Sequence, residues 1–191
     1  MTTAYYSHED CLDHVTPPGH PEQVARLEAI AKVLSDEAFA ALDRRDAPLA
    51  ARADLMLCHP GTYIDRVAAA IPEDGWASLD ADTHLSPGSM HAALRGAGAC
   101  VAAVDAVLAG EVANAFVGCR PPGHHAERRF FGGFCYFNNN ALAAQYLKPY
   151  GKVAILDIDY QHGNGQQDIF YRQADVLTVF LHGHPGFAYP Y

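Results

Sequence analysis

The chain has 191 residues, of which half are hydrophobic and 18% are charged. This composition excludes a disordered chain, and the length predicts one globular domain over residues 1–191. The net charge of −9 disfavours direct nucleic-acid binding, which needs basic patches. The first residues, MTTAYYSHEDCLDH, lack the pattern of a signal peptide, and uninterrupted apolar stretches stay short. We therefore expect a cytoplasmic protein without a membrane span.

The first half of the chain is predicted to be mostly helical. Apolar residues at three- and four-residue spacing predict a helix that opens at Pro21 and Glu22 and includes residues 24–34. Further helices are predicted over residues 61–71 and 91–109, the second of them after the turn-forming SPGS. Residues 54–59 look like a short strand.

The second half alternates between apolar runs and helical patterns. Residues 115–119, 153–158 and 176–181 are apolar runs without alternation, and residues 138–147 and 166–171 are predicted helices. This order predicts a parallel sheet that is flanked by helices and buried on both faces. Polar residues follow each of the three runs. In such sheets the carboxyl ends of the strands form the ligand site, so these polar segments are expected to meet there.

The first polar segment contains two adjacent histidines, His124 and His125, in RPPGHHAERRFFGGFCYFNN. Two prolines and a glycine fix the loop before them, and the later glycines allow close backbone approach. An isolated pair of loop histidines would usually bond only to local carbonyls. The second polar segment, which follows a separate strand, makes a shared site the stronger interpretation.

The second polar segment is VAILDIDYQHGNG, residues 153–165. Asp157 and Asp159 lie two residues apart at the end of an apolar strand, so their side chains can point the same way. Two carboxylates in this position are costly unless cations, a metal or hydrogen-bond donors pair with them. Helix capping would explain one of the two aspartates but not both.

The motifs RPPGHHA, GGFCYFNN and LDIDYQHGNG, in this order and spacing, resemble the zinc-dependent histone deacetylase and acetylpolyamine amidohydrolase family. GHPEQVARLEAI and DADTHLSPGSMHAALRGAG resemble the bacterial, class II-like branch. The resemblance spans essentially all 191 residues and implies an arginase/deacetylase-like fold. The family's catalytic domain is much longer than this chain, so the resemblance implies only its N-terminal portion.

The resemblance also assigns roles by position. It implies that His124 and His125 handle the proton transfers of catalysis and that Asp157 orients His124. Asp159 stands at a zinc-ligand position, and Asn164 stands beside the second histidine as in class II members. The remaining matches imply walls of a substrate tunnel, and these are Gly133, Phe134 and Tyr189. Zn²⁺ would lower the pKa of a bound water and polarise the amide carbonyl.

Two positions depart from the family pattern. Gln161 stands where the family has a zinc-ligating histidine, and a carboxamide oxygen is a weaker ligand for zinc than an imidazole. The adjacent His162 would need a backbone rotation to replace it. Phe180 stands where the family has a serine that helps to bind a structural K⁺ ion. Both the Zn²⁺ and the K⁺ assignments are therefore weakened in this chain.

Cys135 suggests a rival chemistry, a thiol nucleophile paired with His124. The five cysteines of the chain occur singly, without a C-x-x-C pair. This distribution is typical of reduced thiols that pack as small hydrophobic residues. We therefore interpret Cys135 as a packing residue.

The expected function is the metal-dependent hydrolysis of N-acyl amides, with a small cationic acylated amine or an acyl-lysine peptide as substrate. The alternative is a catalytically silent relative that acts through binding or pairs with a missing half. Because the final apolar run, residues 176–181, leads into a loop without a closing helix, we also expect an exposed apolar edge. Such an edge leaves association between copies of the chain open.

Overall fold

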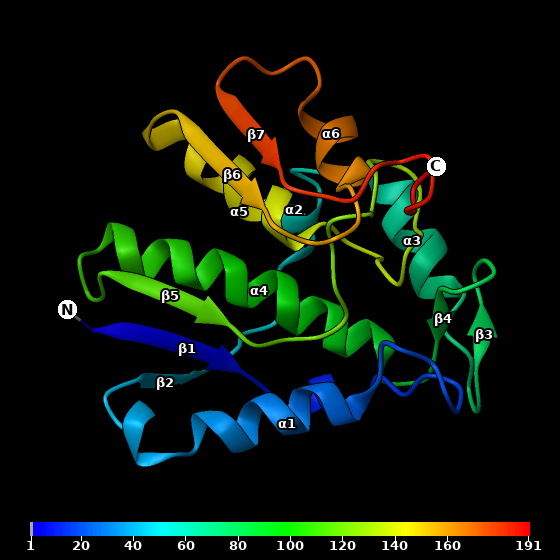
Figure 1. The fold of residues 1–191 in the computed structure, drawn as a ribbon, viewed down its shortest axis with the longest axis horizontal. Coiled ribbons are helices and arrows are strands. Elements are labelled where there is room, and N and C mark those ends of the chain that lie inside the picture. The colour runs from blue at the N-terminus through cyan, green and yellow to red at the C-terminus, as the bar shows by residue number, and fades with distance from the viewer. Residues whose placement is uncertain (1) are drawn as a thin grey trace.

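The architecture is a set of parallel strands covered by helices, and the computed structural model describes residues 2–191 of it (Figure 1). One sheet has the order β2-β1-β5, and β6 pairs with β7 in a second sheet. A short antiparallel hairpin, β3-β4, stands apart. The strand bounds are β1 Thr3–Ser7, β2 Asp43–Asp46, β3 Ala77–Ser78, β4 His84–Leu85, β5 Asn114–Val117, β6 Val153–Asp157 and β7 Val176–Phe180.

The helices lie between and around these strands. The α-helices are α1 Val24–Leu34, α2 Arg52–Leu55, α3 Gly61–Ala69, α4 Ser89–Leu108, α5 Asn139–Leu147 and α6 Asn164–Phe170. Short 3₁₀ turns complete the set, namely η1 Glu9–Leu12, η2 Glu37–Phe39 and η3 Lys148–Tyr150. The chain therefore has the parallel-sheet α/β fold flanked by helices that the sequence predicts.

The long helix α4 is the element on which the two sheets are assembled. It packs against β1 and β5 on one side and against α5 on the other. Its small residues allow this close packing: a Cβ on Gly98 would lie 2.1 Å from the Pro48 carbonyl oxygen. With a mean hydropathy of 1.3 over an 18-residue window, α4 passes the length and composition test of a membrane span. The same composition is typical of the core helix of a globular domain, and α4 packs against β1, β5 and α5.

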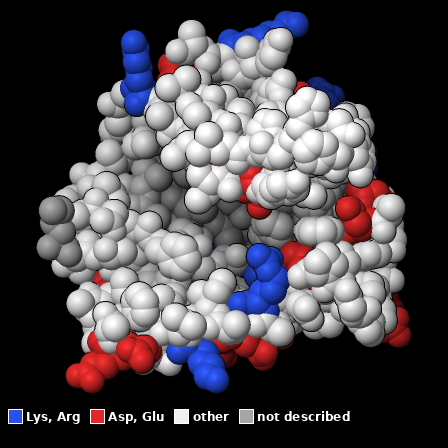
Figure 2. Space-filling view, in the orientation of Figure 1, with Lys and Arg blue, Asp and Glu red and all other residues white. Residues whose placement is uncertain are grey.

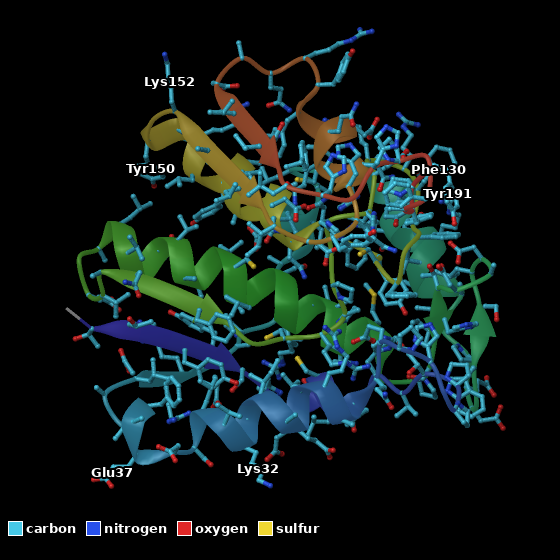
Figure 3. All side chains as sticks on the ribbon, viewed as in Figure 1. Lys32, Glu37, Phe130, Tyr150, Lys152 and Tyr191 are labelled. Atoms are coloured by element: carbon cyan, nitrogen blue, oxygen red, sulfur yellow. The ribbon has the colours of Figure 1, made fainter. Side chains whose placement is uncertain are left out.

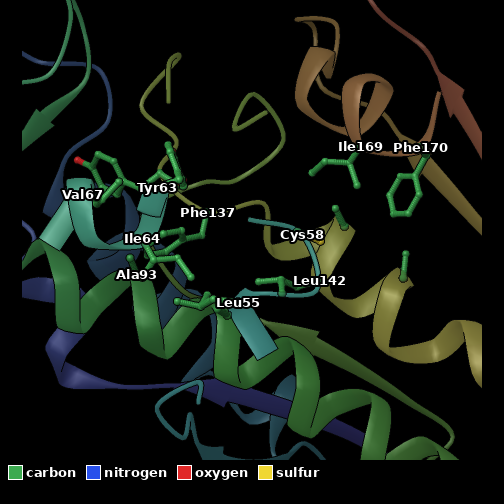
Figure 4. Close-up of a cluster of buried hydrophobic side chains, with 14 of the residues drawn as sticks. Leu55, Cys58, Tyr63, Ile64, Val67, Ala93, Phe137, Leu142, Ile169 and Phe170 are labelled. Carbon is green, nitrogen blue, oxygen red and sulfur yellow. The ribbon is translucent and has the colours of Figure 1, made fainter. Parts of the chain in front are cut away.

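Two apolar clusters form the core. The larger joins α2, α3, α4, α5 and α6, and Leu55, Tyr63, Phe137, Leu142 and Phe170 belong to it (Figure 4). The smaller packs β1 and β5 against α4 and includes Ala4, Tyr6 and Ala99. Burial of this kind stabilises a fold by roughly 25 cal/mol for each Å² of apolar surface removed from water. The clusters hold the strand ends at which the polar segments begin.

Most predicted elements of the second half are present, and the corrections fall mainly in the first half. The prediction of a strand over residues 54–59 is wrong: α2 ends at Leu55 and hydrogen-bonded turns follow. The run is apolar because Leu55 and Cys58 enter the core, which a helix and turn achieve as well as a strand. Helix α1 begins at Val24 rather than at Pro21 or Glu22, because Gln23 still has extended backbone angles.

The expectation that the sheet is buried on both faces is wrong for β6 and β7. Along β6, Leu156 is 63% exposed while Asp157 is buried, and in β7 Leu177 is 61% exposed. Ile158, directly after β6, is 74% exposed. The apolar composition therefore reflects one face that packs on helices, β6 on α5 and β7 on α6, while the other face is open to solvent. The exposed apolar surface is consistent with the expectation drawn from the final apolar run.

A pH-dependent stability is expected from His59, which is buried beside α3. Its Nε2 atom accepts the backbone N–H of Asn138 at 3.0 Å, and burial lowers its pKa to about 4. In the unfolded chain His59 is protonated below about pH 6.5, whereas in the folded chain it stays neutral until the pH approaches 4. The contribution of His59 to the free energy of unfolding is therefore fully present above pH 6.5. It falls by on the order of 3 kcal/mol as the pH drops towards 4.

This prediction is checked by urea unfolding at pH 7 and pH 5 for the unmodified chain and for His59→Gln. Glutamine can accept the same backbone N–H but does not titrate in this range. The variant is expected to lose much less stability between the two pH values. Equal losses in both proteins would show that His59 does not cause the change.

Candidate active site

The polar segments that follow the strands meet at one end of the molecule. In Figure 3, Tyr150 and Lys152, which precede β6, lie at the end opposite Phe130 and Tyr191. The loop of residues 120–133 follows β5, residues 158–163 follow β6, and residues 181–191 follow β7. The carboxyl ends of the strands therefore deliver histidine, aspartate and amide side chains to the same region, as the sequence predicts.

His124 is paired with Asp157 at the end of β6. Its Nδ1 atom lies 3.0 Å from Asp157 Oδ2. Burial alone would raise the pKa of Asp157, but the hydrogen bonds from His124 and from the Asp159 backbone N–H outweigh it and keep the pKa lowered. An ionised Asp157 holds the proton of His124 on Nδ1. The Nε2 atom of His124 then carries a lone pair and can accept a proton.

His125 is held by a different partner, Asn164 at the start of α6. The Asn164 amide nitrogen donates to Glu127 Oε1 at 2.9 Å, which turns its Oδ1 atom towards His125 Nδ1 at 2.8 Å. His125 therefore donates its Nδ1–H to Asn164. Burial lowers the pKa of His125, and the neighbouring His124 lowers it further. The ring is consequently favoured in its neutral form, with the lone pair on Nε2.

The side chain of Gln161 is hydrogen-bonded to the Nε2 atom of His125. Its side-chain oxygen lies 3.0 Å from that nitrogen. If this oxygen is the contact atom, His125 must be protonated on both nitrogens. If His125 is neutral, the amide must turn by 180° and present its NH₂ group, because the oxygen and nitrogen of a carboxamide exchange places in this way. In both states, the nitrogen that would exchange a proton with a substrate is already hydrogen-bonded.

Asp159 does not join a metal cluster. Its side chain is 54% exposed, its Oδ1 atom accepts the Gln161 backbone N–H at 2.8 Å, and the same atom lies 4.0 Å from His124 Nε2. Within residues 2–191, no group of three histidine, cysteine, aspartate or glutamate side chains is placed to hold a metal ion. Gln161 is a neutral amide engaged with His125, so these residues do not fit a tight zinc site.

Phe180 similarly changes the region where the resemblance implies K⁺. It stands opposite Asp157 in the β6–β7 ladder, and its ring packs edge-on against His162 with centroids 4.5 Å apart. An aromatic ring offers no oxygen atom to a hard cation. The side chain of His162 lies within hydrogen-bonding reach of Gln167, and its Nδ1 atom is buried without a partner. The residues present therefore do not fit the K⁺ ion either.

The loop that carries the two histidines is anchored from behind by Arg120. Its guanidinium makes a two-pronged ion pair with Glu22, at 2.6 and 2.7 Å, and donates to the carbonyl oxygens of Cys11 and His14. Burial alone would raise the pKa of Glu22, but hydrogen bonds from His14 and Arg120 outweigh it and hold the pKa at about 2. The start of the loop is thereby fixed to the N-terminal segment.

Glycines bring the loops into direct contact. A Cβ on Gly165 would lie 2.3 Å from the Ala126 carbonyl oxygen, and one on Gly163 would lie 2.5 Å from Asp157 Oδ2. Gly133, at φ +52°, leaves no room for a side chain because a Cβ would lie 2.3 Å from the His125 ring. These contacts set the distance between the histidine loop and α6.

Two of the three residues predicted to form a tunnel, Gly133 and Tyr189, lie against the His125 ring. Gly133 backs its ring, and Tyr189 packs edge-on against it with centroids 4.9 Å apart. Phe134 has φ +70° and turns its ring towards His20, with centroids 4.8 Å apart. A groove of about 280 Å³ reaches His124 instead, and Asp157 and Asp159 also line it. The tunnel itself stays a prediction.

The structure also bears on residues with rival or unpredicted roles. Cys135 is fully buried, burial raises the pKa of its thiol, and its Sγ donates to the Gly133 carbonyl oxygen. These are properties of a packing residue rather than a nucleophile. Glu127 and Gln166 were not predicted, although they orient Asn164 and donate to Asp157 respectively. Their spacing from His124 and Asn164 was the available signal, and it is too general to single them out.

Comparison with known proteins shows which family the sequence matches. Residues 20–191 match the model of the family described as "Histone deacetylase domain". The chain is 41% identical to the histone deacetylase-like amidohydrolase of Pseudomonas aeruginosa over 94% of the chain and 53% of that protein. It is 46% identical to the acetylpolyamine amidohydrolase of Mycoplana ramosa, over 67% of the chain and 39% of that protein.

The fold comparison agrees with the sequence comparisons. The crystal structure of the HDA15 HD domain matches 98% of the chain with a TM-score of 0.91 and 34% sequence identity. The chain covers 57% of that structure. It thus spans about half the length of the curated relatives it matches, or less.

Proposed function

Because this chain belongs to the histone deacetylase domain family, we propose that it supplies the histidine half of a site for hydrolysing N-acyl amides of cationic amines. The substrate class would be acetylated polyamines or acetyl-lysine, in line with relatives named acetylpolyamine amidohydrolase and histone deacetylase 15. One observation carries the proposal. Each histidine is held through Nδ1 by its own polar partner, Asp157 or Asn164, so that both Nε2 atoms face residues 159–161.

Amide hydrolysis requires one group that removes a proton from water and one that gives a proton to the leaving amine. His124 suits the first role, since the ionised Asp157 stabilises the imidazolium that forms when Nε2 takes the proton. His125 suits the second role once Gln161 releases its Nε2 atom. No step is assigned to zinc, because Gln161 and Asp159 are engaged with other groups in the described residues.

A second candidate function is favoured by the contact between Gln161 and His125. A site whose proton donor is capped by an amide, and whose donor set does not fit zinc, can still bind an acylated amine without cleaving it. In this case the chain would act through binding. The two candidates share the substrate class and differ in whether bound substrate is hydrolysed.

Binding of a cationic acylated amine is testable with two compounds of nearly equal shape. N-Acetylputrescine carries an ammonium group where N-pentylacetamide has a methyl group. Because the chain carries a net charge of −9, N-acetylputrescine is expected to bind about tenfold more tightly at low ionic strength. The difference should shrink towards 1 M salt, where the Debye length falls to about 3 Å.

The measurement is titration of ¹⁵N-histidine-labelled protein followed by NMR. The ring signals of His124 and His125 are expected to move with N-acetylputrescine, and those of His8, which lies beside Asp10, to stay in place. Equal binding of both compounds at low salt would contradict the charge argument. Ring signals of His124 and His125 that do not respond to either compound would overturn the proposed site. Release of acetate during the titration separates hydrolysis from silent binding.

A further inference from the structure

A second hollow lies away from the two histidines, between the loop that follows η1 and the turn that precedes β3. It has a volume of about 550 Å³ and is lined by Asp13 and Val15 on one side, by Trp76 on the other, and by Ser86 just before α4. The Ser86 hydroxyl accepts the Val15 backbone N–H at 3.0 Å and donates to the Asp13 carbonyl oxygen at 3.2 Å, which ties the loop to the start of α4. None of these residues lines the groove at His124, so this hollow, the Trp76 pocket, is a separate feature.

Trp76 forms one wall of the pocket, and its ring is held in place by a hydrogen bond. It is the only tryptophan of the chain and is 48% exposed. Its indole N–H donates to the Val15 carbonyl oxygen at 3.0 Å, which fixes the edge of the ring to the opposite loop. The ring therefore borders the pocket in a defined orientation. The face of an indole carries partial negative charge and attracts cations more strongly than the other aromatic rings do.

The segments that build the pocket carry acidic residues and no basic ones. Residues 1–25 and 67–94, to which every residue of the pocket belongs, contain four aspartates or glutamates each and neither lysine nor arginine. Two of these acidic residues are paired with arginines from elsewhere in the chain, whereas Asp13 is exposed and lines the pocket. Around the β3–β4 hairpin, at the right, Figure 2 shows acidic but no basic side chains. The electrostatic field at the pocket therefore favours a cation.

We propose that the Trp76 pocket binds an alkylammonium ion, which contacts the indole of Trp76 and has the Asp13 carboxylate as its counter-ion. A free polyamine and a lysine side chain share this chemistry.

The residues of the pocket favour an alkylammonium ion over the other classes of ligand. A divalent metal ion fits less well, because Ca²⁺ takes about six to eight oxygen ligands and the pocket offers one carboxylate. A neutral or anionic ligand would gain nothing from Asp13. The proposal goes beyond the proposed function, since the pocket is separate from the groove at His124 and takes the charged end of an amine without an acyl group.

Trp76 also supplies the test, because fluorescence excited selectively in tryptophan comes from this residue alone. The 191-residue chain is titrated with putrescine, with Nα-acetyl-lysine amide and with uncharged 1,4-butanediol. Putrescine is expected to change the emission of Trp76 until the change saturates, and butanediol to have no effect. The lysine compound shows which source of the ammonium group binds more tightly. Towards 1 M salt, where the Debye length is about 3 Å, the half-saturating concentration of putrescine should rise about tenfold.

A matched pair of variants locates the counter-ion. Asp13→Asn removes a charge from the pocket, and Asp74→Asn removes one from the adjacent exposed turn, outside the lining of the pocket. The first is expected to raise the half-saturating concentration of putrescine about threefold to fivefold, and the second to change it by less than about twofold. Both variants keep Trp76, so the same fluorescence signal reports on each.

The proposal is overturned if putrescine leaves the emission of Trp76 unchanged, or if the two variants respond alike. It is also overturned if butanediol, or MgCl₂ at equal ionic strength, gives the same response as putrescine. Failure of the proposed function is a different result, namely ring signals of His124 and His125 that do not respond to N-acetylputrescine.

Discussion

Replacing Gln161 by histidine is expected to raise the zinc affinity of this chain by about tenfold or more. An imidazole is a stronger zinc ligand than a carboxamide, and loss of even a residue that orients a ligand typically lowers affinity about 10- to 100-fold. The change also removes the amide that now occupies His125 Nε2. Acetate release from an acetylated amine should rise together with zinc binding, since bound zinc would polarise the amide carbonyl and loss of the Gln161 amide frees His125 Nε2 for proton transfer.

Competition with a chromophoric chelator measures the zinc affinity, and Gln161→Asn is the matched control because it keeps the amide. Asp159→Ala combined with Gln161→His should abolish the gain, since Asp159 lies in the same turn and supplies the carboxylate. If the unmodified chain already binds stoichiometric zinc as tightly as Gln161→His, Gln161 is not the defect. His162 would then be the first residue to test as a ligand.

Substituting Arg120 by methionine is expected to destabilise the chain by about 3–5 kcal/mol. Arg120 is 4% exposed and Glu22 is 1% exposed, so the variant leaves a buried carboxylate without its main partner. Removing one member of a buried ion pair costs roughly this amount, because the remaining charge stays desolvated. Urea unfolding at pH 7 measures the change in the free energy of unfolding.

Arg52→Met is the matched control for this substitution. Arg52 also makes a two-pronged pair, with Asp65, but the two side chains are 51% and 66% exposed. An exposed pair of this kind contributes about 0–1 kcal/mol. Similar losses in the two variants would show that burial does not set the strength of the Arg120 pair. A loss confined to Arg120→Met would support its role as the anchor of the histidine loop.

Local patterns in the sequence predict the elements whose residues repeat at a clear period. The helical spacing of α4 and the apolar runs of β6 and β7 are of this kind. Strand β2 could not be predicted, because its sequence is DRRD and it lies at the edge of the sheet with alternate side chains exposed. Its position follows from its pairing with β1, which is distant from β2 in the sequence, rather than from its own composition.

The same division applies to the candidate site. The pairing of His124 with Asp157 follows from strand order and from the family motifs, and the structure contains it. The contact of Gln161 with His125 depends on how two side chains turn towards each other across 36 positions of sequence. The ion pair of Arg120 with Glu22 spans 98 positions. Neither residue of that pair carries a local signal of its partner, so both contacts required the three-dimensional structure.

The tight contacts of Gly163 and Gly165 have a consequence for inferring activity from sequence signatures. A side chain at either position would collide with the Asp157 carboxylate or with the Ala126 carbonyl, so the two glycines of HGNG are required for this packing of the loops. Gln161, two positions earlier, is partly exposed and can vary without such a collision. A lineage under selection only for a folded domain would therefore retain these two glycines, while the position at which the resemblance implies a zinc ligand could change. The glycines of HGNG therefore indicate that the loops pack. The residue at position 161, which contacts His125, is the one that indicates whether the site can bind a metal.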